Sequence, residues 1–305
     1  MHLAEGVLPL GQALAWCGLA APALVWSVAG ERVARRADPS AATLSAGATS
    51  LLFAATLLPL PVPVIGATSH ICLTPVLSVV LGVRRVVWPT FFVLLLQALF
   101  FAHGGITTLG VNTLTLGVIG PLVTLALRPV LKNFGASGLG AACALGGLAV
   151  YVADALVLAM ALADAAAPQT TFVSVVLGFA PVQVPLALLE GVASAALLRV
   201  LLRRRPDLLP AHSRSLDPAL PVSRPSALLA LLVLFGGAGC NYSGIDGTVF
   251  GATAEAAGRP SQASWIDFSQ GELGLAMSIV VLFSLGSVAG RTWERLNADR
   301  NSPAR

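Results

Sequence analysis

Charged side chains are scarce in this sequence. They make up 10% of its 305 residues, against roughly 25% in a soluble domain, whereas hydrophobic residues supply 56%. A soluble domain of this length needs far more polar surface, so the composition excludes one and predicts a polytopic protein of the lipid bilayer. The 18 basic residues are scattered between apolar segments rather than gathered on one face, which argues against a nucleic-acid partner.

Several motifs of catalysis and energy conversion are missing. There is no G-x-x-x-x-G-K-[ST] phosphate-binding loop, so we do not expect ATP hydrolysis, and there is no H-E-x-x-H zinc-protease motif. The H-x-x-x-x-D-H pattern of single-component nickel and cobalt permeases is absent as well. The four cysteines form no C-x-x-C pair, which argues against a disulfide framework and favours small buried hydrophobes. The sequence therefore predicts neither an enzyme nor a bound organic cofactor.

Apolar segments recur along the chain, and a helix needs about 20 such residues to cross a bilayer. We predict an all-α polytopic membrane protein with about nine transmembrane helices, near 8–30, 41–65, 69–82, 86–103, 105–127, 137–163, 172–202, 226–241 and 273–290. Segment 69–82 is short, and the segment before it ends in Pro59, Pro61 and Pro63, which break helices. Interrupted helices at membrane depth must be packed in protein or line a cavity, so we expect residues 59–75 in the interior.

Positive charge is absent from the first 31 residues, and its distribution further along predicts the orientation. With the N-terminus outside and nine alternating spans, 17 of the 18 basic residues lie on the cytoplasmic side and only Arg259 lies outside. The first segment lacks the basic start and the cleavage site of a signal peptide, so we expect Met1 to remain. These features predict a multi-pass protein of the bacterial inner membrane that begins Met-His on the outer face.

The start Met1-His2 offers three nitrogen ligands to a metal ion. The α-amino group of Met1 loses its proton easily near neutral pH, and the amide nitrogen and imidazole of His2 follow directly along the chain. Together they can close two fused chelate rings in one plane, and one further imidazole completes a square. Planar nitrogen coordination is typical of Ni(II) and Cu(II), with Co(II) also possible. The alternative is that His2 is an exposed terminal residue that binds nothing.

The chain has four histidines, so few residues can supply the fourth nitrogen. His212 falls in a polar linker, whereas His70 and His103 fall on the outer side together with His2. His70 is the candidate fourth ligand, and His103 and Asn112 are candidates to contact or orient the ligands. The alternatives are a histidine bonded to a backbone carbonyl and, for Asn112, a hydrogen bond between helices with no role in metal binding.

Two acids, Asp154 and Glu190, lie inside predicted spans. A proton relay or an ion-coupled carrier could use them, whereas hydrogen bonds between helices are the simpler explanation. Cys72, two residues beyond His70, could add a thiolate ligand, but a single cysteine among apolar neighbours is interpreted as packing.

Two stretches resemble a known family: residues 1–9, MHLAEGVLP, and residues 97–121, QALFFAHGGITTLGVNTLTLGVIGP. Both are similar to the substrate-capture (S) components of energy-coupling-factor transporters for cobalt and nickel, the CbiM/NikM type, and the resemblance covers residues 1–205. It implies a seven-helix bundle in which Met1, His2 and His70 bind the metal. It also implies separate cytoplasmic ATPases that act through a transmembrane coupling subunit. The EG-x-LP variant of the first motif looks closer to cobalt-type members than to nickel-type ones.

The remaining chain divides into two parts. Residues 206–225 are polar and Pro-rich and predict a cytoplasmic linker. Residues 226–305 hold the last two spans and an outer loop, an arrangement that resembles the small CbiN/NikN-type subunit that accompanies these S components. We therefore expect a fused importer subunit whose transported substrate is Co²⁺ rather than Ni²⁺. The alternatives are a nickel-specific S component, a secondary carrier that works without ATPases, and an intramembrane metalloenzyme.

Overall fold

The computed structural model describes residues 3–57, 60–62, 67–101, 103–210, 243–244, 246–260 and 262, with short helical stretches between 280 and 296. Met1, His2 and His212 lie outside the described residues, as do most of the predicted linker 206–225 and all of the predicted span 226–241. The predicted span 273–290 is described only in part. The described part thus includes nearly all of the region predicted to form the S-component bundle, residues 1–205.

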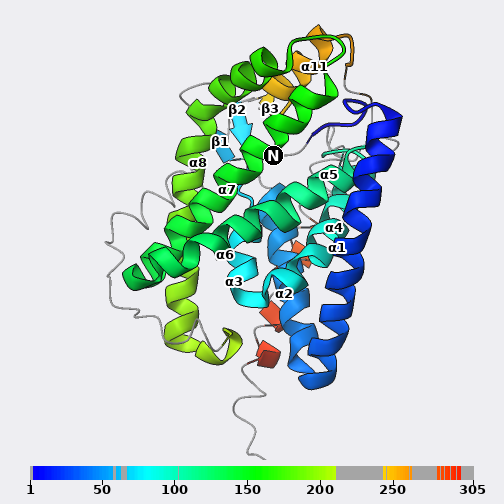
Figure 1. Cartoon of the computed structure of the whole chain (residues 1–305). Coiled ribbons are helices and arrows are strands. Elements are labelled where there is room, and N and C mark those ends of the chain that lie inside the picture. Colours follow the sequence, from blue (N-terminus) through cyan, green and yellow to red (C-terminus); the bar gives the residue numbers. More distant parts are fainter. Residues whose placement is uncertain are drawn as a thin grey trace, which may run out of the picture.

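Helices form most of the described chain, which confirms the predicted helical class (Figure 1). The long helices are α1 (Leu10–Ala37), α2 (Ser40–Leu57), α4 (Val83–Phe100), α7 (Gly135–Ala161) and α8 (Pro168–Arg204). The shorter helical elements are α3 (Thr74–Leu81), α5 (Leu109–Leu114), η1 (Thr115–Ile119), α6 (Gly120–Leu131), η2 (Lys132–Phe134), η3 (Pro206–Leu208), η4 (Asp246–Gly251) and α11 (Ala252–Ala256). Among the described residues, five helical stretches are long and apolar enough to cross a membrane: Leu10–Ala37, Ser40–Leu57, Val83–Phe100, Leu109–Ala161 and Pro168–Arg204.

The stretch Leu109–Ala161 reverses direction at Gly135, where φ is +61°. Glycine adopts this left-handed conformation readily because it has no Cβ. Beyond the turn, α7 packs antiparallel to α6, since the Thr124 hydroxyl donates to the carbonyl of Ala142 at 3.3 Å. The other face of α7 packs along α8. One apolar stretch therefore supplies two neighbouring helices of the bundle.

The predicted span 69–82 is not one continuous helix. Residues 70–73 have no helical structure, and α3 has eight residues. At 1.5 Å per residue, α3 measures about 12 Å, which is too short to cross a hydrocarbon layer of about 30 Å. All eight residues of α3 are buried, against α2, α4, α6 and α7. The expectation that this region lies in the interior is confirmed for Ser69 to Pro75, where only Ile71 is partly exposed.

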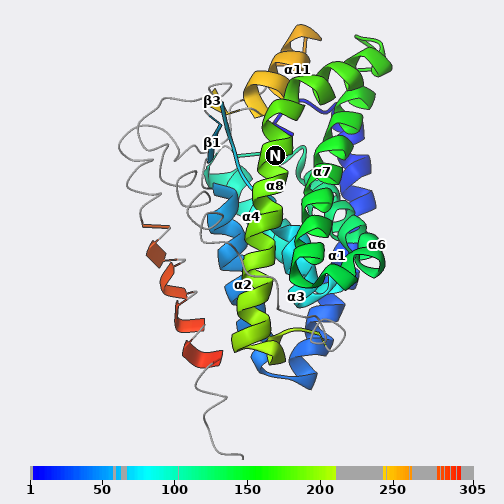
Figure 2. The ribbon, with the colours of Figure 1, turned by 90° about the vertical axis from the view of Figure 1, so that its left-hand side faces the viewer.

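Three short strands, which we did not predict, lie near one end of the bundle (Figure 2). Strand β1 (Leu60–Val62) pairs antiparallel with β2 (Ala67–Ser69), and β2 pairs parallel with β3 (Ser243–Gly244). Strand β2 leads directly into His70. The sheet therefore brings part of the C-terminal region beside the segment that carries a candidate ligand.

The two ends of the bundle carry separate ion pairs. At the end where α1 meets α2, Glu31 accepts hydrogen bonds from Arg35 and Arg85, at 2.8 and 2.9 Å. At the opposite end, Arg259 pairs with Asp164 in the loop between α7 and α8, beside α11 (Figure 1). Arg259 thus lies apart from Arg35 and Arg85, as the sequence predicted.

Candidate metal centre

Two of the predicted site residues, His70 and His103, are in contact. Their ring centroids lie 5.1 Å apart, with the ring planes at 63°. His70 follows β2 and is 3% exposed, and His103 lies in the loop between α4 and α5. The backbone N–H of His103 donates to the carbonyl of Gln97 at 3.3 Å. The prediction that both histidines lie on the same side of the bundle is confirmed.

The surroundings of His70 favour a neutral imidazole. His70 is 3% exposed and contacts the ring of His103, and burial disfavours a charged imidazole. Its Nδ1 is 3.2 Å from the carbonyl of Ile71. A proton on Nδ1 donates to that carbonyl and leaves the lone pair on Nε2, which is the form of imidazole that binds metal ions.

Asn112 holds the backbone of Leu3, the residue directly after His2. The Leu3 N–H donates to Oδ1 of Asn112 at 3.0 Å, and Nδ2 of Asn112 donates to the Leu3 carbonyl at 3.1 Å. The Thr108 hydroxyl donates to the same carbonyl at 2.7 Å. We expected Asn112 to orient a histidine side chain or to join helices. Its hydrogen bonds with Leu3 fix the main chain directly after His2, because Leu3 lies against α5 and presents both backbone groups to it.

Glu5 ties the same N-terminal segment to the loop before α5. Its Oε2 accepts hydrogen bonds from the backbone N–H groups of Ile106 and Thr107. Gly105 allows this close approach, since a Cβ there would lie 2.6 Å from Cα of Glu5. We assigned no role to Glu5 from the sequence. The only sign of such a role in the sequence is the position of Glu5, three residues after the candidate ligand His2.

Glu190 in α8 is buried, and it bonds to the segment that carries His70. Its two carboxyl oxygens accept hydrogen bonds from the backbone N–H groups of Leu73, at 2.8 Å, and Cys72, at 3.3 Å. We expected Glu190 to bond between helices; it bonds instead from α8 to the non-helical residues directly before α3. Asp154 in α7 is fully buried. Cys72 and Cys143 are buried, as expected for packing, whereas Cys17 is exposed, contrary to our expectation for the cysteines.

Within the described residues, no group of three or more His, Cys, Asp and Glu side chains gathers to hold a metal ion. His70 and His103 alone are too few for a complete metal site. The predicted ligands Met1 and His2 lie outside the described residues. Their neighbour Leu3 shares one hydrophobic cluster with Cys72, two residues from His70. The start of the described chain therefore lies in the same region of the core as the His70 segment.

Part of the C-terminal region rests on the N-terminal segment. The backbone N–H of Gln262 donates to the carbonyl of Glu5 at 3.0 Å. Phe250 packs against Phe179 of α8, with ring centroids 5.1 Å apart. Arg259 donates to the carbonyl of Ala161 and pairs with Asp164. Residues 246–262 thus lie over the end of the bundle that holds the N-terminal segment.

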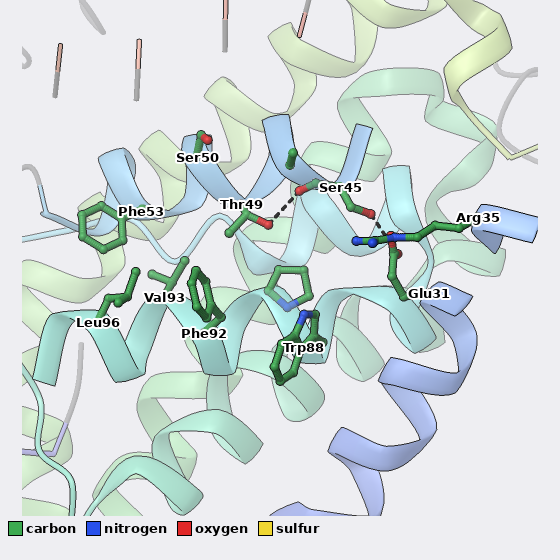
Figure 3. Close-up of a pocket in the computed structure, with 12 residues that line it drawn as sticks. Glu31, Arg35, Ser45, Thr49, Ser50, Phe53, Trp88, Phe92, Val93 and Leu96 are labelled. Atoms are coloured by element: carbon green, nitrogen blue, oxygen red, sulfur yellow. Dashed lines mark hydrogen bonds and ion pairs between the residues drawn. The ribbon is translucent and has the colours of Figure 1, made fainter. Parts of the chain in front are cut away.

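A separate cavity of about 360 Å³ runs between α1, α2 and α4 (Figure 3). Its lining is apolar at Phe53 and Phe92 and becomes charged at Glu31 and Arg35. Neither His70 nor His103 lines it. With one carboxylate that is already paired with arginine, this cavity does not suit a metal ion.

Comparison with known proteins adds independent information. The family model described as CbiM, "Cobalt uptake substrate-specific transmembrane region", matches residues 2–208. The protein named "Cobalt transport protein CbiM" from Geobacter sulfurreducens is 33% identical over 318 residues, which covers 99% of this chain and 91% of that protein. The protein of the same name from Sorangium cellulosum is 40% identical over 218 residues, which covers 68% of this chain and 94% of that protein.

A solved structure titled "Crystal Structure of an Truncated Transition metal Transporter" has a similar fold. It superimposes with a TM-score of 0.56 at 22% identity and covers 67% of this chain and 99% of that chain. A second structure, titled "Crystal Structure of an transition metal transporter", gives the same TM-score of 0.56 at 21% identity. At this identity the likeness concerns the fold.

Proposed function

The chain belongs to the CbiM family of substrate-specific transmembrane regions, and from this premise we propose that it captures Co²⁺ for import across the membrane. It is a multi-pass integral membrane protein, of the inner membrane in bacteria, and acts as a transporter subunit rather than as an enzyme. In this proposal the metal ion is the transported substrate. No organic cofactor takes part.

The proposed ligands are the amine of Met1, the amide and imidazole of His2, and the imidazole of His70. The observation that carries this assignment is the clamp on Leu3, whose N–H and carbonyl are both bound by Asn112. Fixing the backbone of residue 3 restricts the two residues before it, which is what a terminal chelate requires to bind a metal without a large entropy loss. His103 supports His70 through ring contact.

We propose cobalt over nickel as the substrate. The relatives are named as cobalt transport proteins, and the N-terminal EG-x-LP sequence points the same way. A planar set of four nitrogens also suits Ni(II), so a nickel-specific S component is the alternative. Loading the purified protein with an equal mixture of the two metals decides between them.

The topology we propose places the N-terminus outside. Residues 1–205 then form the S-component bundle with seven passages, including the broken one made by residues 70–73 and α3. Residues 206–225 form a cytoplasmic linker, and 226–305 form a two-helix accessory module. Support comes from the ion pairs of Arg35 and Arg85 at one end and of Arg259 at the other, which fit the positive-inside rule.

We propose that the described parts of this accessory module, residues 243–244, 246–260 and 262, help to load the metal. The supporting contacts are those of Gln262 with Glu5 and of strand β3 with β2, which precedes His70. Both contacts reach segments next to proposed ligands. Energy is proposed to come from cytoplasmic ATPases through a transmembrane coupling subunit. Uptake into vesicles that persists without these partners and ATP would identify a secondary carrier instead.

The experiment that tests the site compares purified protein with the native N-terminus and purified protein with Gln-Pro inserted between Met1 and His2. Bound cobalt and nickel are measured by mass spectrometry. We expect the insertion to remove about one equivalent of metal, because it separates the amine from the imidazole and because proline has no N–H to lose, which interrupts the fused chelate rings. A matched control carries Gln-Pro between Ala166 and Ala167, in the exposed α7–α8 loop, and should bind normally. Equal binding by all three proteins would place the metal elsewhere.

A further inference from the structure

We propose that Glu190 is a positioning residue for metal binding, which holds the segment from His70 to Leu73 in the shape that presents the His70 imidazole to the metal. The inference rests on the proposed function, because it takes His70 as a ligand. Glu190 lies near the middle of α8, and 1% of its surface is exposed. A carboxyl group buried so deeply inside a membrane protein is kept only where it has specific partners.

The partners of Glu190 are two consecutive backbone amides. Leu73 donates to Oε1 at 2.8 Å and Cys72 donates to Oε2 at 3.3 Å, so both oxygens hold the same short stretch. Leu73 is the N-cap of α3 and makes no side-chain cap of its own. The first amides of a helix need an acceptor from outside the helix. Glu190 supplies it to the residues at this start, although α8 is 117 residues further along the chain.

The backbone at this point is strained, which explains why it needs an external hold. Leu73 has φ of +56° and is the only non-glycine residue with positive φ in the described part of the chain. This left-handed conformation is unfavourable for a residue with a Cβ. It lets the chain turn from the non-helical residues 70–72 into α3. Without the bond to Glu190, Leu73 can relax to negative φ, and His70, three residues earlier, then changes position.

The neighbouring helix leaves room for the carboxyl group. A Cβ at Gly147 of α7 would lie 2.7 Å from Oε2 of Glu190. Alanine at this position must therefore displace the carboxyl group or push α7 away from α8. The G147A substitution disturbs the bonds of Glu190 to Cys72 and Leu73 without changing the carboxyl group itself. It therefore provides a second, independent perturbation.

The experiment uses Cu(II) as the probe in the purified full chain with its native N-terminus, because Cu(II) shares the planar preference and reports its nitrogen ligands by electron paramagnetic resonance. In E190Q an NH₂ group replaces one oxygen and cannot accept an N–H bond, while the side-chain volume stays nearly the same. We expect metal affinity to fall about 10- to 100-fold, the usual effect of losing a partner that orients a ligand. The spectrum should change from four nitrogen ligands to three, because the N-terminal chelate remains and His70 leaves. G147A should give the same change.

The control is Q183L, which removes another buried polar side chain two turns earlier on α8, whereas the bonds to Cys72 and Leu73 come from Glu190. It should keep four nitrogens and native affinity. A four-nitrogen spectrum with unchanged affinity in E190Q or G147A overturns the positioning role, as does an equal loss in Q183L. A native protein that never shows the three N-terminal nitrogens refutes the proposed function itself, so the two failures are distinguishable.

Discussion

Asn112→Ala removes both hydrogen bonds by which Asn112 holds the Leu3 backbone, at 3.0 and 3.1 Å. The Leu3 carbonyl keeps its bond from Thr108, so the main loss falls on the buried Leu3 N–H. A buried donor left without a partner costs about 1–3 kcal/mol. If the N-terminal segment is ordered only when this bond forms, the same free energy appears in metal affinity. At about 1.4 kcal/mol per factor of ten, we expect binding to weaken between about 5- and 150-fold.

The assay is competition for cobalt with a chromophoric chelator at fixed pH, on purified protein whose N-terminus is confirmed by mass spectrometry. Asn112→Asp keeps an oxygen for the Leu3 N–H but lacks the donor to the carbonyl, so its affinity should be intermediate. Thr113→Val is the matched control. Thr113 is fully buried in the same helix and donates to the carbonyl of Leu109, not to Leu3. Native affinity in Asn112→Ala, or an equal loss in Thr113→Val, would refute the reasoning.

Three further predictions follow from particular contacts. His70→Ala should abolish stoichiometric cobalt binding, because His70 is a proposed ligand. His103→Ala should weaken cobalt binding about 10-fold, since His103 touches the ring of His70 without being a proposed ligand. Equilibrium dialysis measures both effects. Gly110→Ala should lower the free energy of unfolding by about 1–3 kcal/mol, and with it the thermal unfolding temperature, because the new Cβ would lie 2.5 Å from the backbone of α1. Gly11→Ala, whose Cβ would have nothing within 4 Å, should leave the unfolding temperature unchanged. Glu31→Ala should destabilise the protein by about 1.5–3 kcal/mol, since it removes the charged hydrogen-bond partner of the partly buried Arg85; an unchanged unfolding temperature in detergent would contradict this.

The sequence alone determined the class of the protein, and it supplied the residues of the proposed site. A low charge content and long apolar runs predict membrane helices. A run of about 20 apolar residues is favourable in lipid whichever neighbours it later packs against. Counting spans also placed His70 and His103 on one side, whereas the contact between their rings is a finding of the structure. Short local patterns were enough for these conclusions. The start Met1-His2 carries its chelating chemistry in adjacent residues, although its position lies outside the described residues.

Only the tertiary structure decided how the site is held. Leu3 and Asn112 are 109 residues apart, and Leu73 and Glu190 are 117 apart, so no local pattern could pair them. The break before α3 escaped a count of apolar residues, because extended and helical backbone in the interior need the same hydrophobic side chains. What makes the break possible is a carboxyl group on a distant helix that satisfies its amides. Hydrogen bonds of this kind depend on where helices meet in space, and that is a property of the packed bundle rather than of any one segment.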